Sequence, residues 1–178
     1  LAHIASAYYL SNFKDRAAGL SYDGSGDAVS IMLADCNDTE IKVLERVFLP
    51  KSLGHFYSAV CNYIGFDKFG EEYKVMGLSA YGEDKYSDYF NDLIGYDEKY
   101  CLRQKKIFNY NSIDYKKNQI IKFNKNIFLN KKVEKFSQES KDIAKSLQVT
   151  FEKIVMQIID RLQKKVPSNN LVMAGGCA

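Results

Sequence analysis

The N-terminal part of the chain alternates between short apolar runs and turn-forming residues. Three apolar runs, Ala17–Asp23, Val29–Leu33 and Ile41–Leu49, are separated by glycine and by clusters of Asp and Asn. Runs of this length bounded by such residues predict strands joined by tight turns. Ahead of them, His3–Tyr9 is predicted to form a helix that ends near Ser11. We therefore expect a helix followed by a three-stranded meander.

Apolar residues at helical spacing predict three further helices. The pattern runs from Leu53 to Phe66, and Glu71–Leu78 is a second candidate. The longest pattern predicts a helix that stops before Pro167. Its apolar face consists of Ile143, Ala144, Leu147, Phe151, Ile154, Val155, Ile158, Ile159 and Leu162.

The last residues combine a strand with a glycine turn. Leu171–Ala174 is predicted to be a short buried strand, and Gly175 and Gly176 follow it. A buried strand needs neighbours on both sides, and such a turn usually leads into a helix, so we expect residues 1–178 to be a fragment of a longer domain. Residues 94–136 have no sustained period and are predicted to be an insertion of short strands and loops in an α/β domain.

The composition is that of one globular domain. Hydrophobic residues make up 46% and charged residues 26% of the 178 residues. No apolar run approaches the roughly 20 residues that cross a bilayer, and no signal-peptide pattern is visible, so we expect no membrane segment and a cytoplasmic location. Cys36, Cys61, Cys101 and Cys177 lack the spacing of a zinc site or a disulfide framework and are predicted to be free thiols.

Positive charge is concentrated in one segment. Between Arg103 and Lys132 there are nine Lys and Arg residues and one acid, Asp114, with five aromatic residues among them. Interleaved basic and aromatic residues are typical of nucleic-acid-binding proteins. Asn and Lys are enriched along the whole chain, however, which favours a solvated insertion. A nucleic-acid-binding module remains the non-enzyme alternative.

The stretch Asp23-Gly24-Ser25-Gly26-Asp27 supports two interpretations. A carboxylate at a strand end followed by glycines suits a phosphate loop, and Asp23 there could bind a metal ion. Asp-Gly is also the commonest signal of a short hairpin turn. A second glycine turn, Gly175-Gly176, strengthens the first interpretation, because an actin-like ATPase fold clasps a nucleotide with two such turns.

Three polar residues of the predicted helices are further candidates for binding or catalysis. His3 starts a predicted helix and could be a metal ligand or a general base. Glu72 could bind a ribose hydroxyl, and Lys74 could neutralise a phosphate or polarise a carbonyl oxygen. The alternative for Glu72 and Lys74 is an exposed, salt-bridged helix.

Taken in order, these segments resemble the O-carbamoyltransferase family, which includes nodulation and antibiotic-tailoring carbamoyltransferases. The block Glu72–Leu78, Glu-Tyr-Lys-Val-Met-Gly-Leu, is specific, and the ordered set is more so. The resemblance spans nearly the whole chain and rests on residues 3–9, 23–27, 52–54, 56–60, 65–66, 72–82, 144–148 and 174–176.

The resemblance implies a fold and a chemistry. The family's catalytic domain is similar to the universal tRNA threonylcarbamoyltransferase and has the actin-like ATPase (ribonuclease H-like) fold, of which we expect this chain to be a part. Carbamoyl phosphate and ATP would give carbamoyl adenylate, and the carbamoyl group would pass to a hydroxyl of a sugar, an antibiotic or a similar small molecule. The enzyme alternatives are a tRNA threonylcarbamoyltransferase and another actin-like ATPase or sugar kinase.

The resemblance also implies a divalent metal ion, iron in some members, that contacts the nucleotide phosphates through two histidines and two aspartates. His3 matches the second histidine of an H-x-x-x-H pattern, and Asp23 matches the first aspartate. The first histidine would precede residue 1, and the second aspartate would follow Ala178. The small domain that forms carbamoyl adenylate is absent as well. We therefore expect the fragment to be inactive, its parent to be active, and a homodimer to be one form of the assembly.

The residue types and the family resemblance indicate one set of candidate residues. His3 and Lys74 are the candidate catalytic residues, and His3 and Asp23 are the candidate metal ligands. The candidate nucleotide-binding residues are Asp23, Gly24, Gly26, Glu72, Lys74, Gly175 and Gly176.

Overall fold

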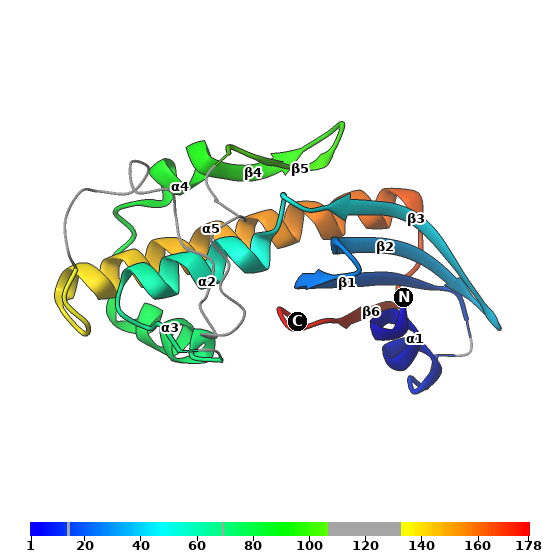
Figure 1. Cartoon of the computed structure of the whole chain (residues 1–178). Coiled ribbons are helices and arrows are strands. Elements are labelled where there is room, and N and C mark those ends of the chain that lie inside the picture. Colours follow the sequence, from blue (N-terminus) through cyan, green and yellow to red (C-terminus); the bar gives the residue numbers. More distant parts are fainter. Residues whose placement is uncertain (14, 69, 107–132) are drawn as a thin grey trace. The chain divides into compact units, whose positions relative to one another are not determined.

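The computed structural model describes residues 1–13, 15–68, 70–106 and 133–178. Figure 1 shows its elements, which follow one another as α1 (Ala2–Tyr9), β1 (Ala17–Gly26), β2 (Val29–Asn37), β3 (Glu40–Phe48), α2 (Leu53–Tyr63), α3 (Glu72–Leu78), the 3₁₀-helix η1 (Ser79–Tyr81), α4 (Ser87–Leu93), β4 (Ile94–Asp97), β5 (Cys101–Gln104), α5 (Gln138–Lys165) and β6 (Leu171–Ala174). In the described part of the chain, no helix combines the length and apolarity that crossing a membrane requires.

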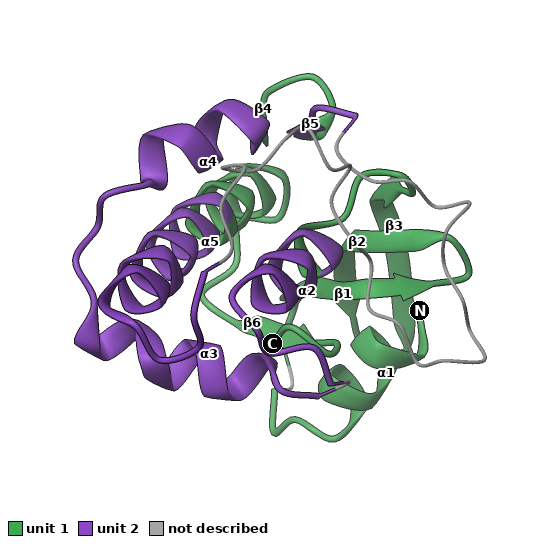
Figure 2. Cartoon of the chain, turned by 60° about the vertical axis from the view of Figure 1, so that its left-hand side comes forward, with its two compact units in different colours: residues 1–54, 96–102, 155–178 green, residues 55–95, 103–154 purple. Residues whose placement is uncertain are grey.

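The chain divides into two compact units, coloured green and purple in Figure 2. The first unit contains residues 1–54, 96–102 and 155–178, and the second contains residues 55–95 and 103–154. The boundary falls inside the long helix α5, so each unit receives one part of that helix.

The first unit is built on a four-stranded sheet with the strand order β3-β2-β1-β6. The strands β1, β2 and β3 pair antiparallel in sequence order, which confirms the predicted meander. The strand β6 pairs with β1 in parallel, so a strand from the far end of the sequence completes the sheet. A mixed sheet together with helices confirms the α/β class.

Both faces of this sheet are buried near β1. On one face, Ile4 and Tyr8 of α1 pack into a cluster with Ala17, Met32, Ala34, Cys36 and Val172. Gly19 allows this contact, because an added Cβ would lie 2.9 Å from Cγ2 of Ile4. The opposite face presents Leu20 and Leu33, which are buried as well.

An ion-pair cluster links α5 to the sheet within the first unit. The Nε atom of Arg161 donates to Oε2 of Glu45 at 2.9 Å, and Nζ of Lys165 lies 2.7 Å from Oε1 of the same residue. Burial alone would raise the pKa of Glu45, but these hydrogen bonds and charges lower it below its ordinary value. The end of α5 is therefore held electrostatically at β3.

The second unit has a helical, aromatic core. Phe56 of α2 meets Phe90 of α4 edge to face, with ring centroids 5.6 Å apart. Tyr57 contacts Phe151 of α5 in the same way at 5.3 Å, and its hydroxyl donates to Oε1 of Gln148 at 2.9 Å. These pairs join α2, α4 and the N-terminal part of α5 into one packed group.

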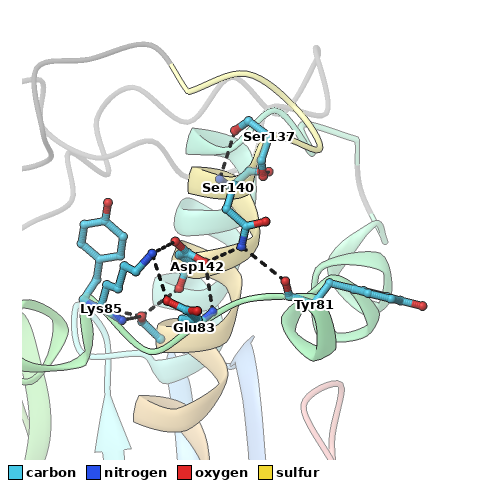
Figure 3. A network of polar contacts seen from close by, with 9 residues as sticks. Tyr81, Glu83, Lys85, Ser137, Ser140 and Asp142 are labelled. Carbon is cyan, nitrogen blue, oxygen red and sulfur yellow. Dashed lines mark hydrogen bonds and ion pairs between the residues drawn. The ribbon is translucent and has the colours of Figure 1, made fainter.

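A buried polar network ties the loop after η1 to α5, as Figure 3 shows. The carboxylate of Asp142, 3% exposed, accepts hydrogen bonds from Glu83 N, Gln138 Nε2 and Lys85 Nζ at 2.9, 2.9 and 2.7 Å. Burial would raise the pKa of Asp142, but these bonds lower it overall. The hydroxyl of Ser146 accepts from Lys85 N at 3.0 Å, so both side chains fix the same loop.

The structure corrects two sequence-based expectations. The tight turn of the first hairpin is not the glycine stretch but Asp27-Ala28, which have φ angles of 52° and 63° and lie between the paired residues Gly26 and Val29. The strand β6 has only Val172 fully buried and pairs with β1 alone among the described strands, because it lies at the edge of the sheet.

The predicted insertion, residues 94–136, lies largely outside the described residues. Its beginning forms the two-stranded sheet of β4 and β5, in agreement with the expected short strands. Residues 107–132, which carry most of the basic segment, are not among the described ones. The insertion therefore stays a prediction.

Candidate active site

The two predicted glycine loops lie side by side in the first unit. The strands β1 and β6 are parallel neighbours with Ser21 paired to Ala174, so the residues that follow this pair lie at the same end of the sheet, as Figure 1 shows. Gly175 has a φ of +114°, and an added Cβ would lie 2.3 Å from the carbonyl oxygen of Tyr22. Only glycine fits this close approach of the two backbones.

The carboxylate of Asp23 lies where these loops meet. Its Oδ1 atom accepts a hydrogen bond from Gly24 N at 2.6 Å. A Cβ added to Gly176 would lie 3.0 Å from the same oxygen. Gly26 stands apart from these contacts, because it pairs with Val29 at the hairpin base and an added Cβ would meet nothing within 4 Å. The structure thus gathers Asp23, Gly24 and the second glycine pair, but not Gly26.

The side chain of His3 faces the other oxygen of this carboxylate. Its Nδ1 atom lies 3.7 Å from Oδ2 of Asp23, and the two side chains are 53% and 30% exposed. Residues at the start of α1 and at the end of the regular part of β1 therefore share a solvent-accessible position.

This pair fits half of a metal site. Two donors that each lie about 2.1 Å from one ion are at most about 4.2 Å apart, and the distance of 3.7 Å is within that limit. Imidazole nitrogen and carboxylate oxygen are both accepted by divalent iron and related ions. Among the described residues, however, no group of three or more His, Cys, Asp or Glu side chains is placed to hold a metal ion. A complete site needs further ligands.

The second unit carries the other two candidates. The Oε1 atom of Glu72 accepts a hydrogen bond from Ser58 Oγ at 2.7 Å. Lys74, on the same short helix, is exposed, and its Nζ atom lies 2.9 Å from Oε1 of the buried Glu71. The predicted alternative of a salt-bridged helix is thus present, although with Glu71 rather than Glu72 as the acid.

The ion pair determines the charge of Lys74. The hydrogen bond to Glu71 raises the pKa of Lys74 above its ordinary value, and the same bond lowers the pKa of Glu71. Lys74 is therefore protonated at neutral pH. This favours a role in neutralising phosphate charge over one in accepting a proton.

The cysteines are free, as predicted, and three of them are buried. Burial raises the pKa of Cys36 and of Cys101 to about 11 and raises that of Cys61 further. These three thiols are protonated at neutral pH and unsuited to nucleophilic chemistry. Cys177 is partly exposed and follows the second glycine pair.

The described end of the basic segment is engaged within its own unit. Arg103 donates to the carbonyl oxygen of Asn91, and Nζ of Lys105 lies 2.6 Å from Oδ2 of Asp92. These contacts occupy two of the cations on which a nucleic-acid-binding role would rest.

Ser52 and Glu71 contribute contacts that the sequence does not assign to them. Ser52 donates its hydroxyl to the carbonyl oxygen of Gly24 at 2.7 Å, and Glu71 holds Lys74. Glu71 could be expected from its spacing of three residues to Lys74 on a helix. No comparable signal links Ser52 to Gly24, because they are distant in the sequence.

Comparison with known proteins identifies the family. The whole chain, residues 1–178, matches the family described as the carbamoyltransferase N-terminus. The chain therefore belongs to the carbamoyltransferase family and corresponds to its N-terminal region.

The chain is also similar to individual proteins over nearly its whole length. The chain is 31% identical over 99% of its length to protein sll1178 of Synechocystis, of which it covers 29%. It is 30% identical over 100% of its length to nodulation protein NolNO of Sinorhizobium fredii, covering 25% of that protein. It is 31% identical over 99% of its length to nodulation protein NolO of Bradyrhizobium diazoefficiens, covering 30%. The chain thus spans about a quarter to a third of the length of these relatives.

Proposed function

We propose that the full-length protein carrying this chain is an O-carbamoyltransferase. One observation carries the proposal: a chain of the carbamoyltransferase family brings the Asp23 carboxylate, two glycine loops and His3 together at one end of the strands of its sheet. Loops whose backbones approach closely at a strand end are suited to binding phosphate groups. The proposed fold is that of the actin-like ATPases.

The proposed reaction has two steps. Carbamoyl phosphate, ATP and water give carbamoyl adenylate, phosphate and pyrophosphate. The oxygen of an acceptor hydroxyl then attacks the carbamoyl carbon, the bond from that carbon to the phosphate oxygen of the adenylate breaks, and AMP leaves while the hydroxyl releases its proton. The acceptor is a hydroxyl of a sugar, an antibiotic or a similar small molecule. Because ATP and carbamoyl phosphate are cytoplasmic metabolites, we expect the reaction to occur there.

The residues of the first unit would bind and orient the nucleotide. The glycine loops at Gly24 and at Gly175-Gly176 would contact the phosphate, and His3 and Asp23 would hold a divalent metal ion, iron being one candidate. When bound, the ion would reduce the negative charge of the phosphate and of the departing AMP. Holding the reacting groups in line is expected to contribute more than any single base.

The residues of the second unit are proposed on narrower grounds. Glu72 is the candidate partner of a ribose hydroxyl, and Lys74, protonated beside Glu71, is the candidate for neutralising phosphate charge. Gly26 is a nucleotide-binding candidate only because it belongs to the sequence Asp23-Gly24-Ser25-Gly26-Asp27.

The identity of the carbamoyl donor tests the proposal. The full-length protein is expected to form pyrophosphate from ATP only when carbamoyl phosphate is present, and to release AMP only when an acceptor is present as well. A protein that ignores carbamoyl phosphate and depends strictly on threonylcarbamoyl adenylate would instead be a tRNA threonylcarbamoyltransferase. ATP consumption driven by a sugar alone would identify a sugar kinase.

The non-enzyme alternative has its own test. Replacing Arg103, Lys105 and Lys106 by Ala should leave the carbamoyl-phosphate-dependent turnover unchanged. Salt-sensitive oligonucleotide binding that disappears in this triple variant, without any turnover in the parent, would favour a nucleic-acid-binding module.

A further inference from the structure

The first glycine loop interrupts the pairing of its own sheet. Tyr22 pairs with Ile31 and Gly26 pairs with Val29, so the three residues Asp23, Gly24 and Ser25 stand opposite Ser30 alone. A bulge of this kind takes backbone groups out of the ladder. Their carbonyl oxygens need other donors wherever water does not reach them.

A buried serine supplies that donor. The hydroxyl of Ser52, which is 0% exposed, donates to the carbonyl oxygen of Gly24 at 2.7 Å, and the carbonyl oxygen of Asp23 lies 3.5 Å from it. In a planar trans peptide the C=O and the following N–H point in opposite directions. Because Ser52 holds the Gly24 carbonyl, the N–H of Ser25 points away from Ser52. Ser25 is an exposed residue.

The segment that carries Ser52 is itself fixed on both sides. The hydroxyl of Ser30, opposite the bulge, donates to the carbonyl oxygen of Lys51 at 2.7 Å. Beyond Ser52, a Cβ added to Gly54 would lie 2.7 Å from both Gly24 N and Cys177 Sγ. The bulge, the start of α2 and the second glycine turn thus pack without room for a further methyl group.

We propose that Ser52 is a positioning residue that orients the Ser25 amide toward a phosphate oxygen of the bound nucleotide. The inference deepens the proposed function and rests on it, because it assumes that the loop binds a nucleotide. Ser52 acts through the backbone of Gly24 and does not itself contact the ligand. Successive amides presented by a bulge or turn are a general means of binding anions.

The dissociation constant of ATP, measured by isothermal titration calorimetry of the full-length protein in the presence of Mg²⁺, tests the proposal. Ser52→Ala removes the hydroxyl and should weaken ATP binding about tenfold, the effect of one hydrogen bond to a charged group. Ser168→Ala is the matched control: Ser168 donates its hydroxyl to the carbonyl oxygen of Arg16, at the opposite end of β1 and β6. It should lower the melting temperature but leave ATP affinity unchanged.

A second pair of variants tests the amide directly and does not depend on the folding of Ser52→Ala. Ser25→Pro deletes the N–H at an exposed position and should also weaken ATP binding about tenfold, whereas Ser25→Ala keeps the N–H and should bind like the parent. If the parent binds ATP and Ser25→Pro binds it equally well, the inference is wrong and the proposed function stands. If the parent binds no ATP, the proposed function fails and the inference with it.

Discussion

The Nδ1 atom of His3 lies 3.7 Å from the Oδ2 atom of Asp23, while the other oxygen of that carboxylate accepts a hydrogen bond from the Gly24 amide. One oxygen is thus held by the loop, and the other is directed at the histidine. A carboxylate oriented in this way can offer its second oxygen to a shared cation.

Loss of either side chain should lower metal binding. In the full-length protein, His3→Ala and Asp23→Asn are each expected to reduce the bound divalent metal, measured by elemental analysis after dialysis, because each removes one donor. Asp27→Asn is the control, since Asp27 is an exposed carboxylate in the adjacent turn. If the His3→Ala and Asp23→Asn variants bind as much metal as the parent and the Asp27→Asn control, His3 and Asp23 are not ligands.

The Asp142 network should stabilise the fold in a pH-dependent way. Asp142→Asn is expected to lower the free energy of unfolding by about 2 kcal/mol at pH 7, because an amide cannot replace the acceptor facing Lys85. The pKa of Asp142 is lowered in the folded state, so its contribution is complete above the unfolded value and disappears as the pH falls through the folded one. Denaturant unfolding of both proteins should therefore give a difference that shrinks below about pH 4. A difference that stays constant down to pH 2 would contradict this role.

Two glycines of the second unit should respond in opposite ways to alanine. A Cβ at Gly82 would lie 2.0 Å from the carbonyl oxygen of Lys141, whereas one at Gly77 in α3 would meet nothing within 4 Å. Gly82→Ala should lower the free energy of unfolding by about 3 kcal/mol, and Gly77→Ala should raise it by up to about 1 kcal/mol through helix propensity. Thermal unfolding of both variants provides the measurement, and a Gly82→Ala protein as stable as the parent would disprove the close packing.

The first hairpin turn can be improved. Ala28 has a φ of 63° although it is exposed and carries a Cβ. Ala28→Gly should increase the free energy of unfolding by about 1 kcal/mol, because glycine adopts this conformation without the steric cost and Asp-Gly suits a two-residue hairpin turn. A melting temperature below that of the parent would argue against the left-handed geometry at this position.

Hydrophobic spacing predicted most of the fold. The meander, α2, α3 and α5 follow from runs and periods that burial of one face imposes, and α5 ends at Lys165 before Pro167 as expected. The helix α4 was not predicted, since Ser87–Leu93 is short and has only Phe90 and Leu93 buried. The predicted position of the hairpin turn was wrong because alanine is not a residue type that indicates a positive φ.

The candidate site could be predicted only in its components. His3, Asp23 and the glycine pairs stand out by residue type, and the parallel pairing of β1 with β6 brings them together. The contribution of Ser52 depends on a hydrogen bond to Gly24, and such long-range contacts are set by tertiary packing. The exclusion of Gly26 follows from the bulge, whose register no local pattern reveals.

The most direct test of the proposed function is carbamoyl-phosphate-dependent formation of AMP from ATP by the full-length protein, compared with its His3→Ala, Asp23→Ala and Asp27→Ala variants. We expect turnover in the parent and in Asp27→Ala, and a loss of about a hundredfold or more in the other two together with their metal. A parent protein that neither binds a metal ion nor uses carbamoyl phosphate, or His3 and Asp23 variants that turn over like the parent, would contradict the proposed function.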